Sequence, residues 1–133
     1  MNMESQDKKI RSFKKLLNSF KYAFNGIKYA FLYEQNMDIH LIMAILVIVF
    51  GIFFKISIIE WLVCLILIGL VIASELINTS LEATIDLISP KYNEKAKVAK
   101  DTAAGAVLVF ASVAFICGLI IFIPKILCLL SIG

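Results

Sequence analysis

The stretch that decides the fold reads Trp61-LVCLILIGLVIAS-Glu75-LI-Asn78-TSL-Glu82-ATI-Asp86, an apolar run interrupted by four polar residues. Its hydrophobic part is long enough to cross a bilayer, which takes about 20 apolar residues. The offsets of three, four and four residues keep the four polar side chains within about 80° of arc on one helical face. Because carboxylates at membrane depth are costly and are usually kept for function, this polar stripe predicts a functional site.

Composition places the chain in the membrane. Of its 133 residues 61% are hydrophobic and 17% are charged, and the mean hydropathy is +0.93. Soluble domains carry about 25% charged residues. The three cysteines lie in apolar runs without a CxxC pair, which argues against a disulfide framework or a zinc site. We therefore expect an all-α membrane protein that forms one domain over residues 1–133, with no nucleic-acid partner.

Residues 1–11 are polar, and we expect them to be loosely ordered. Over residues 12–33, Phe and Leu recur every three or four positions opposite a basic face, which is typical of a helix lying in the membrane surface. The alternative is an amphipathic helix packed on a protein core. The sequence offers no soluble core for such packing, so the surface helix is favoured.

Three membrane helices are expected to follow, at residues 39–54, 58–88 and 102–123. Ser89-Pro90 should end the second helix and Pro124 the third. A chain with so few helices has little room to enclose a polar site. We therefore expect a homo-oligomer with sites between subunits.

Basic residues set the expected orientation. They concentrate in the N-terminal arm and in the loop after the second membrane helix, whereas the other two exposed regions carry only Lys55 and Lys125. The positive-inside rule then puts the N-terminus in the cytoplasm and the C-terminus outside.

This topology gathers charges from four parts of the sequence at one depth on the cytoplasmic side: Glu34, Glu82, Asp86, Lys100 and Asp101. Carboxylates hold hard cations and lysines meet phosphate oxygens, so the group suits Mg²⁺ and a polyphosphate. There is no GxxxxGK[ST] loop to cradle a nucleotide. Glu75 lies deeper, within reach of a lipid hydroxyl, where loss of water favours the proton-accepting role of a general base. The alternative for the stripe is a purely structural polar network between subunits.

The same residues carry a family resemblance. Ala73-SELINTSLEATI-Asp86, followed by Ala99-KDTAAGAV-Leu108, closely resembles the signature of the prokaryotic diacylglycerol kinase family and of its Gram-positive undecaprenol kinase branch. Ser19-FKYAFNGI-Lys28 and Glu34-Gln-Asn36 are similar to the same family. The resemblance covers nearly all of the chain beyond residue 12, and the combination of ExxNxxxExxxD with AKD is highly specific.

The resemblance implies a homotrimer with composite active sites that pass the γ-phosphoryl group of ATP to a lipid hydroxyl. It implies that Glu75 is the general base with Asn78 beside it, and that Glu34 and Glu82 hold Mg²⁺. Around the nucleotide it places Lys15, Tyr22, Glu34, Glu82, Tyr92, Asn93, Lys100 and Asp101. The lipid would enter near Ser19 and Lys28 and reach Glu75.

The leading hypothesis is an ATP-dependent kinase of undecaprenol in the bacterial cytoplasmic membrane. The alternative substrate is diacylglycerol, giving phosphatidic acid. A transporter or proton-conducting subunit is a hypothesis of another class, but it calls for ionisable residues across the whole bilayer, and the stripe stops at Glu75. A structural or lipid-binding scaffold would not require carboxylates and lysines gathered at one depth.

Overall fold

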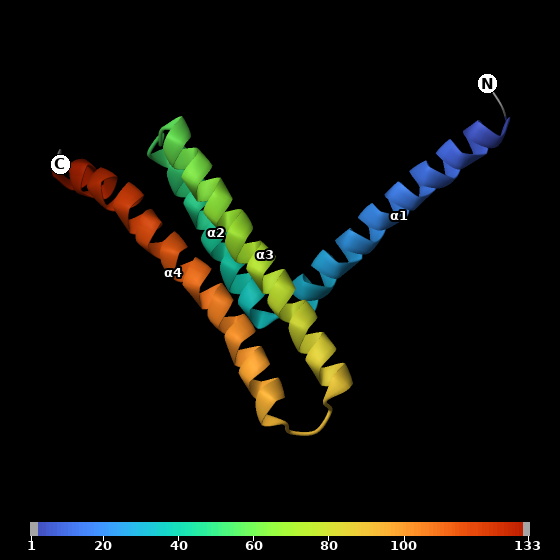
Figure 1. Cartoon of the computed structure of the whole chain (residues 1–133). Helices are drawn as coiled ribbons and strands as arrows, with labels where there is room; N and C mark the ends of the chain where they lie inside the picture. Colours follow the sequence, from blue (N-terminus) through green and yellow to red (C-terminus); the bar gives the residue numbers. More distant parts are fainter. Residues whose placement is uncertain (1–2, 132–133) are drawn as a thin grey trace. The chain divides into compact units, whose positions relative to one another are not determined.

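The computed structural model describes the backbone of residues 3–131 and the side chains of residues 12–131. Every regular element in this part of the chain is a helix (Figure 1). The helices are α1 (Met3–Tyr33), α2 (Gln35–Phe53), α3 (Ile58–Ile88) and α4 (Glu94–Ser131). By length and composition α2, α3 and α4 can each cross a membrane. The predicted all-α membrane fold is confirmed.

Helix α1 forms one unit with Glu34, and α2–α4 form a second. The backbone of α1 is helical from Met3, earlier than the expected start at residue 12. Of the segment predicted to be loosely ordered, Met1 and Asn2 lie outside the described residues. Large apolar side chains on α1, such as Phe13 and Phe24, are exposed. A position in the membrane surface remains a prediction for this helix.

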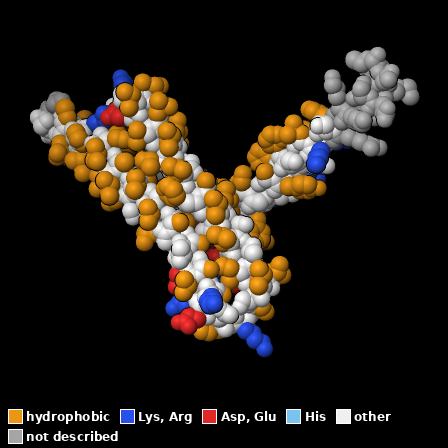
Figure 2. Space-filling view, in the orientation of Figure 1, with side chains coloured by type: hydrophobic (Ala, Val, Ile, Leu, Met, Phe, Trp, Pro, Cys, Tyr) orange, Lys and Arg blue, Asp and Glu red, His pale blue; other side chains and the backbone are white. Residues whose placement is uncertain are grey.

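Helices α2, α3 and α4 run up, down and up, with α3 packed against both neighbours and most extensively against α4. Large hydrophobic side chains stand exposed along all three helices. Figure 2 shows them covering this unit between its ends, where charged side chains gather. An exposed apolar surface of this extent requires lipid or protein to cover it.

The link between α2 and α3 is a tight turn built on a lysine. Lys55 has a φ of 50°, in the left-handed region that glycine usually occupies after a helix. The N–H of Ile56 donates to the Gly51 carbonyl at 3.1 Å and the N–H of Lys55 to the Ile52 carbonyl at 3.2 Å, so the turn is a Schellman motif. The left-handed conformation costs a non-glycine residue about 1–2 kcal/mol, which the two hydrogen bonds offset.

A capping box starts α3 immediately after this turn. The Ser57 N–H donates to Glu60 Oε2 at 2.6 Å, and the Glu60 N–H donates to Ser57 Oγ at 3.3 Å. The other oxygen of Glu60 lies 2.9 Å from Nζ of Lys125 on α4. One carboxylate thus caps α3 and ties it to α4.

Side chains of all three helices pack together at this end. Ile56, Cys64 and Phe122 are buried there, and the ring centroid of Phe122 lies 6.1 Å from that of Phe50 and 6.3 Å from that of Phe54. Trp61 covers Gly51. We call this region the packed end of the α2–α4 unit.

Helix α4 continues through Pro124 to Ser131, although the proline was expected to end the membrane helix. Proline removes only its own backbone donor, and membrane helices tolerate this loss. The ion pair of Lys125 with Glu60 holds the segment beyond the proline against α3. Helix α4 also begins at Glu94, before the expected span at 102, because Asn93 caps it.

Gly51→Ala should destabilise the packed end. The added methyl group would lie 2.7 Å from Cη2 of Trp61, 2.8 Å from its Cζ2 and 3.1 Å from Cδ1 of Ile56. Overpacking of this kind costs about 1–3 kcal/mol of unfolding free energy. Denaturant unfolding in mixed micelles measures the change. Gly69→Ala is the matched control, since no atom lies within 4 Å of its added carbon. If the two variants were equally stable, close packing of Trp61 on Gly51 would be contradicted.

Candidate active site

The polar stripe of α3 contains the most deeply buried ionisable group. Glu75 is 1% exposed and Asn78 is 4% exposed, and Ser74 and Thr79 beside them are buried. Among the described side chains no other charged residue is buried. Helical spacing places Glu75 and Asn78 on one face, as the sequence predicted. The residues before Ser74 on this face are apolar.

Hydrogen bonding leaves two oxygens of the stripe without partners. Asn78 Nδ2 donates to Glu82 Oε1 at 3.0 Å, which orients both side chains. Glu75 Oε1 and Asn78 Oδ1 are buried and accept no hydrogen bond. The neighbouring hydroxyls do not reach them, because Ser74 donates to the Val71 carbonyl and Thr79 to the Glu75 carbonyl.

Two unpartnered acceptors in an apolar setting are unfavourable by about 1–3 kcal/mol each. Such groups in a native structure call for an explanation, and a functional role is one of the recognised ones. Both oxygens can accept a hydrogen bond from an incoming donor such as a hydroxyl group, and the carboxylate of Glu75 can also take its proton. The stripe can therefore receive a donor that the described residues do not supply.

Helices α3 and α4 are joined at the exposed end of the stripe by an ion pair. Lys100 Nζ lies 2.5 Å from Asp86 Oδ1, and the two side chains are 33% and 65% exposed. Exposed pairs contribute about 0–1 kcal/mol, so this contact does little to hold the fold together. It does keep a cationic group beside the acidic end of α3.

The other predicted nucleotide residues of this unit lie around the start of α4. Tyr92 and Asp101 are exposed. Asn93 has a structural role that the sequence analysis missed: its Oδ1 accepts the N–H of Lys95 at 2.9 Å and that of Ala96 at 3.3 Å. An asparagine directly before the acidic first turn of a helix was the available signal. Its amide nitrogen has no hydrogen bond to the described residues.

The remaining predicted site residues belong to the unit of α1. Lys15, Ser19, Tyr22 and Lys28 are exposed along this helix, and Glu34 follows it. Ser19 Oγ donates to the Lys15 carbonyl at 2.9 Å. The unit of α1 and the α2–α4 unit are described separately, without their relative position. The approach of these five residues to the stripe therefore remains a prediction.

The stripe offers oxygen donors of the kind that Mg²⁺ prefers. The described residues contain no cluster of three or more His, Cys, Asp or Glu side chains suited to a metal ion. However, Mg²⁺ in kinases is commonly held by one or two carboxylates together with the substrate phosphates. The carboxylate of Glu82, which Asn78 orients through its hydrogen bond, fits such a partial ligand set.

Comparisons with known proteins agree with this arrangement. The model of the prokaryotic diacylglycerol kinase family matches residues 21–122, which include the whole stripe. Undecaprenol kinase of Bacillus subtilis is 48% identical over 92 residues, which cover 69% of this chain and 75% of that protein. Diacylglycerol kinase of Synechocystis sp. is 40% identical over 101 residues, which cover 75% of this chain and 58% of that protein. A lipid kinase of this kind uses ATP and acts at a membrane, which fits three membrane-length helices with an acidic stripe. The chain therefore belongs to the prokaryotic diacylglycerol kinase family.

Proposed function

We propose that this protein transfers the γ-phosphoryl group of ATP to the hydroxyl of undecaprenol at the cytoplasmic membrane surface, giving undecaprenyl phosphate. The observation that carries the proposal is the pair of buried, unpartnered oxygens of Glu75 and Asn78 in the C-terminal half of a membrane-length helix. The 48% identity to an undecaprenol kinase supports this choice of lipid.

Glu75 acts as the general base. Its carboxylate accepts the proton of the lipid hydroxyl while the hydroxyl oxygen forms a bond to the γ-phosphorus. The bond from that phosphorus to the β–γ bridging oxygen breaks, and ADP leaves with the electron pair. Burial excludes water, which would otherwise compete with the lipid as the nucleophile. Asn78 and Glu82 orient each other through their hydrogen bond.

The phosphate groups are held by charges at the exposed end of the stripe. Glu82 and Glu34 would hold Mg²⁺, which would neutralise charge on the polyphosphate. Lys100, held beside α3 by Asp86, contacts phosphate oxygens. The nucleotide is further surrounded by Lys15, Tyr22, Tyr92, Asn93 and Asp101, and the lipid alcohol passes Ser19 and Lys28.

The site is completed by other subunits of a homotrimer. This proposal is supported by the two unpartnered buried oxygens and by the extensive apolar surface of α2–α4. The basic residues before α2 and between α3 and α4 favour a cytoplasmic N-terminus and an external C-terminus.

Diacylglycerol is the second candidate substrate, favoured by the relative of that name in Synechocystis sp.. The same catalytic groups would serve both lipids, since each presents a hydroxyl at the membrane surface. A proton-conducting role is disfavoured because α3 offers no ionisable relay between Trp61 and Ser74 apart from the thiol of Cys64.

Glu75→Gln should lower kcat for undecaprenol phosphorylation by about 10²–10⁴-fold, the usual contribution of a general base. Assembly and unfolding free energy should be retained, because glutamine has the same shape and carries no charge to bury. Glu94→Gln, at an exposed carboxylate with no assigned role, is the matched control. Transfer of labelled γ-phosphate from ATP measures both variants. A Glu75→Gln enzyme within threefold of the unmodified protein would remove Glu75 from the mechanism.

Glu82→Gln should raise the Mg²⁺ concentration needed for half-maximal activity by about tenfold or more. Even residues that only hydrogen-bond to a metal ligand change metal affinity by about 10–100-fold, and a direct ligand should matter at least as much. Titration of activity with Mg²⁺ at saturating ATP measures the shift, again with Glu94→Gln as the control. The metal role of Glu82 is refuted by an unchanged Mg²⁺ dependence in a variant whose kcat has also changed little.

A further inference from the structure

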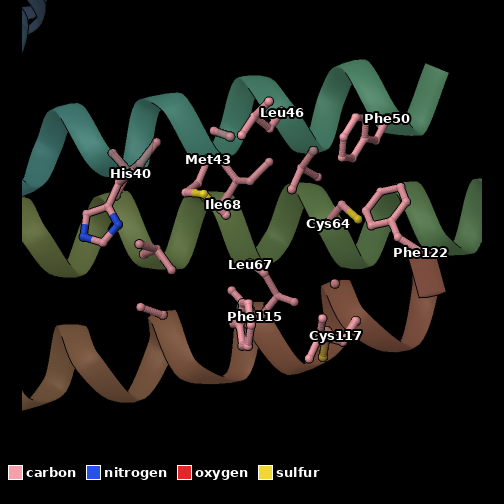
Figure 3. Close-up of a pocket in the computed structure, with 18 of the residues that line it drawn as sticks. His40, Met43, Leu46, Phe50, Cys64, Leu67, Ile68, Phe115, Cys117 and Phe122 are labelled. Atoms are coloured by element: carbon pink, nitrogen blue, oxygen red, sulfur yellow. The ribbon is translucent and has the colours of Figure 1, made fainter. Parts of the chain in front are cut away.

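A cavity of about 340 Å³ lies between α2, α3 and α4, between the polar stripe and the packed end (Figure 3). Its lining is apolar except for the imidazole of His40 and the thiols of Cys64 and Cys117. Phe50 and Phe122 of the packed end line it at one end, and His40 lies at the other, as Figure 3 shows. None of the residues assigned above to catalysis or to nucleotide binding lines this cavity.

The cavity continues the line of the polar stripe along α3. Cys64, Ile68, Val71 and Ile72 line it, and they share with Glu75 a face about 100° wide. Ile72 lies one turn from Glu75, about 4.5 Å along the helix axis, and the lining then runs for about 12 Å to Cys64. A molecule with its polar group at Glu75 would therefore place its next atoms in the cavity.

The wall contributed by α4 is made of small residues at its centre. Ala111, Ala114 and Gly118 follow one another at intervals of three and four, which places them on one face. No atom lies within 4 Å of the position that a Cβ of Gly118 would occupy. The backbone of α4 thus leaves space open that a larger side chain would fill.

The dimensions select the occupant. The cavity is about 12 Å long and its lining is almost entirely apolar, so it suits a stretch of hydrocarbon chain and not a polar group. A cavity of about 150 Å³ holds benzene, so this one has room for about a dozen carbon atoms.

We infer that this cavity holds the first part of a single hydrocarbon tail, that of the lipid alcohol whose hydroxyl reaches Glu75. The inference rests on the proposed function and adds to it the place where the start of the lipid tail is bound. The first two or three five-carbon units of the tail are recognised, and the rest extends into the bilayer.

Gly118→Leu and Ala114→Leu test the inference, because each places a branched side chain inside the cavity. Gly69→Leu is the matched control: Gly69 is exposed, does not line the cavity and has no atom within 4 Å of its Cβ position. Each protein is assayed with isoprenoid alcohols from five carbons up to undecaprenol. All of them carry the same reactive allylic hydroxyl.

Both cavity variants should lower kcat/KM for undecaprenol by about tenfold or more, the usual discrimination of an apolar pocket, and leave the five-carbon alcohol unaffected. Ala114 lies about 6 Å nearer to Ala111 and the His40 end than Gly118 does. The penalty should therefore begin at a shorter chain length in Ala114→Leu than in Gly118→Leu. Equal losses for all chain lengths, or no loss for undecaprenol in folded variants, would overturn the inference. So would a change confined to subunit association, which would assign the cavity to a second copy.

A binding experiment separates failure of this inference from failure of the proposed function. Farnesol carrying a diazirine near its tail end is photolysed with the Glu75→Gln protein, which binds but does not turn over. Labelling should fall on the cavity segments of α2 and α4 and decrease in Gly118→Leu. Labelling of these segments without phosphoryl transfer by the unmodified protein would contradict only the proposed function. Phosphoryl transfer without labelling of these segments would contradict only the binding of the tail in the cavity.

Discussion

The burial of a carboxylate on an apolar helix is the constraint on which the rest of this structure depends. Glu75 is 1% exposed, and one of its oxygens has no hydrogen-bond partner. A group in this state lowers stability unless a donor arrives, and membrane proteins retain such groups where they act on a substrate. Helical periodicity then places Asn78 and Glu82 on the same face of α3, towards its C-terminus, and the apolar lining of the cavity on that face towards its N-terminus.

The two ends of the α2–α4 unit divide stability and chemistry between them. At the packed end, the Schellman turn at Lys55, the capping box of Ser57 and the Glu60–Lys125 pair join the three helices. At the other end, α3 and α4 are joined by the exposed Lys100–Asp86 pair, which contributes little to stability. Because the packed end holds the three helices together, the end that carries the polar stripe can stay open to substrates.

Periodicity alone was enough to predict the three membrane-length helices and the single face of the polar stripe. It could not predict features that depend on contacts between distant residues. Lys55 adopts a left-handed conformation because two backbone hydrogen bonds and the packing of Ile56 near Gly51 favour it. Helix α4 passes through Pro124, and Lys125 beyond it meets Glu60 far away in the sequence. The cavity is lined by small residues of α4 and larger residues of α2. Neither stretch of sequence, taken alone, indicates a cavity. The predicted approach of Glu34 and of α1 to the stripe involves two separate units, and spacing within one helix does not encode it.

The most direct test follows labelled γ-phosphate from ATP, with Mg²⁺, into undecaprenol and, in a separate reaction, into diacylglycerol, using the purified protein. The account predicts rapid transfer to undecaprenol and slower transfer to diacylglycerol, because the start of a polyprenol tail extends from the buried carboxylate into the cavity. Preference for diacylglycerol would contradict the assigned substrate and the role of the cavity. Absence of transfer to either lipid by correctly folded and assembled protein would contradict the assignment of the α3 stripe as a phosphoryl-transfer site.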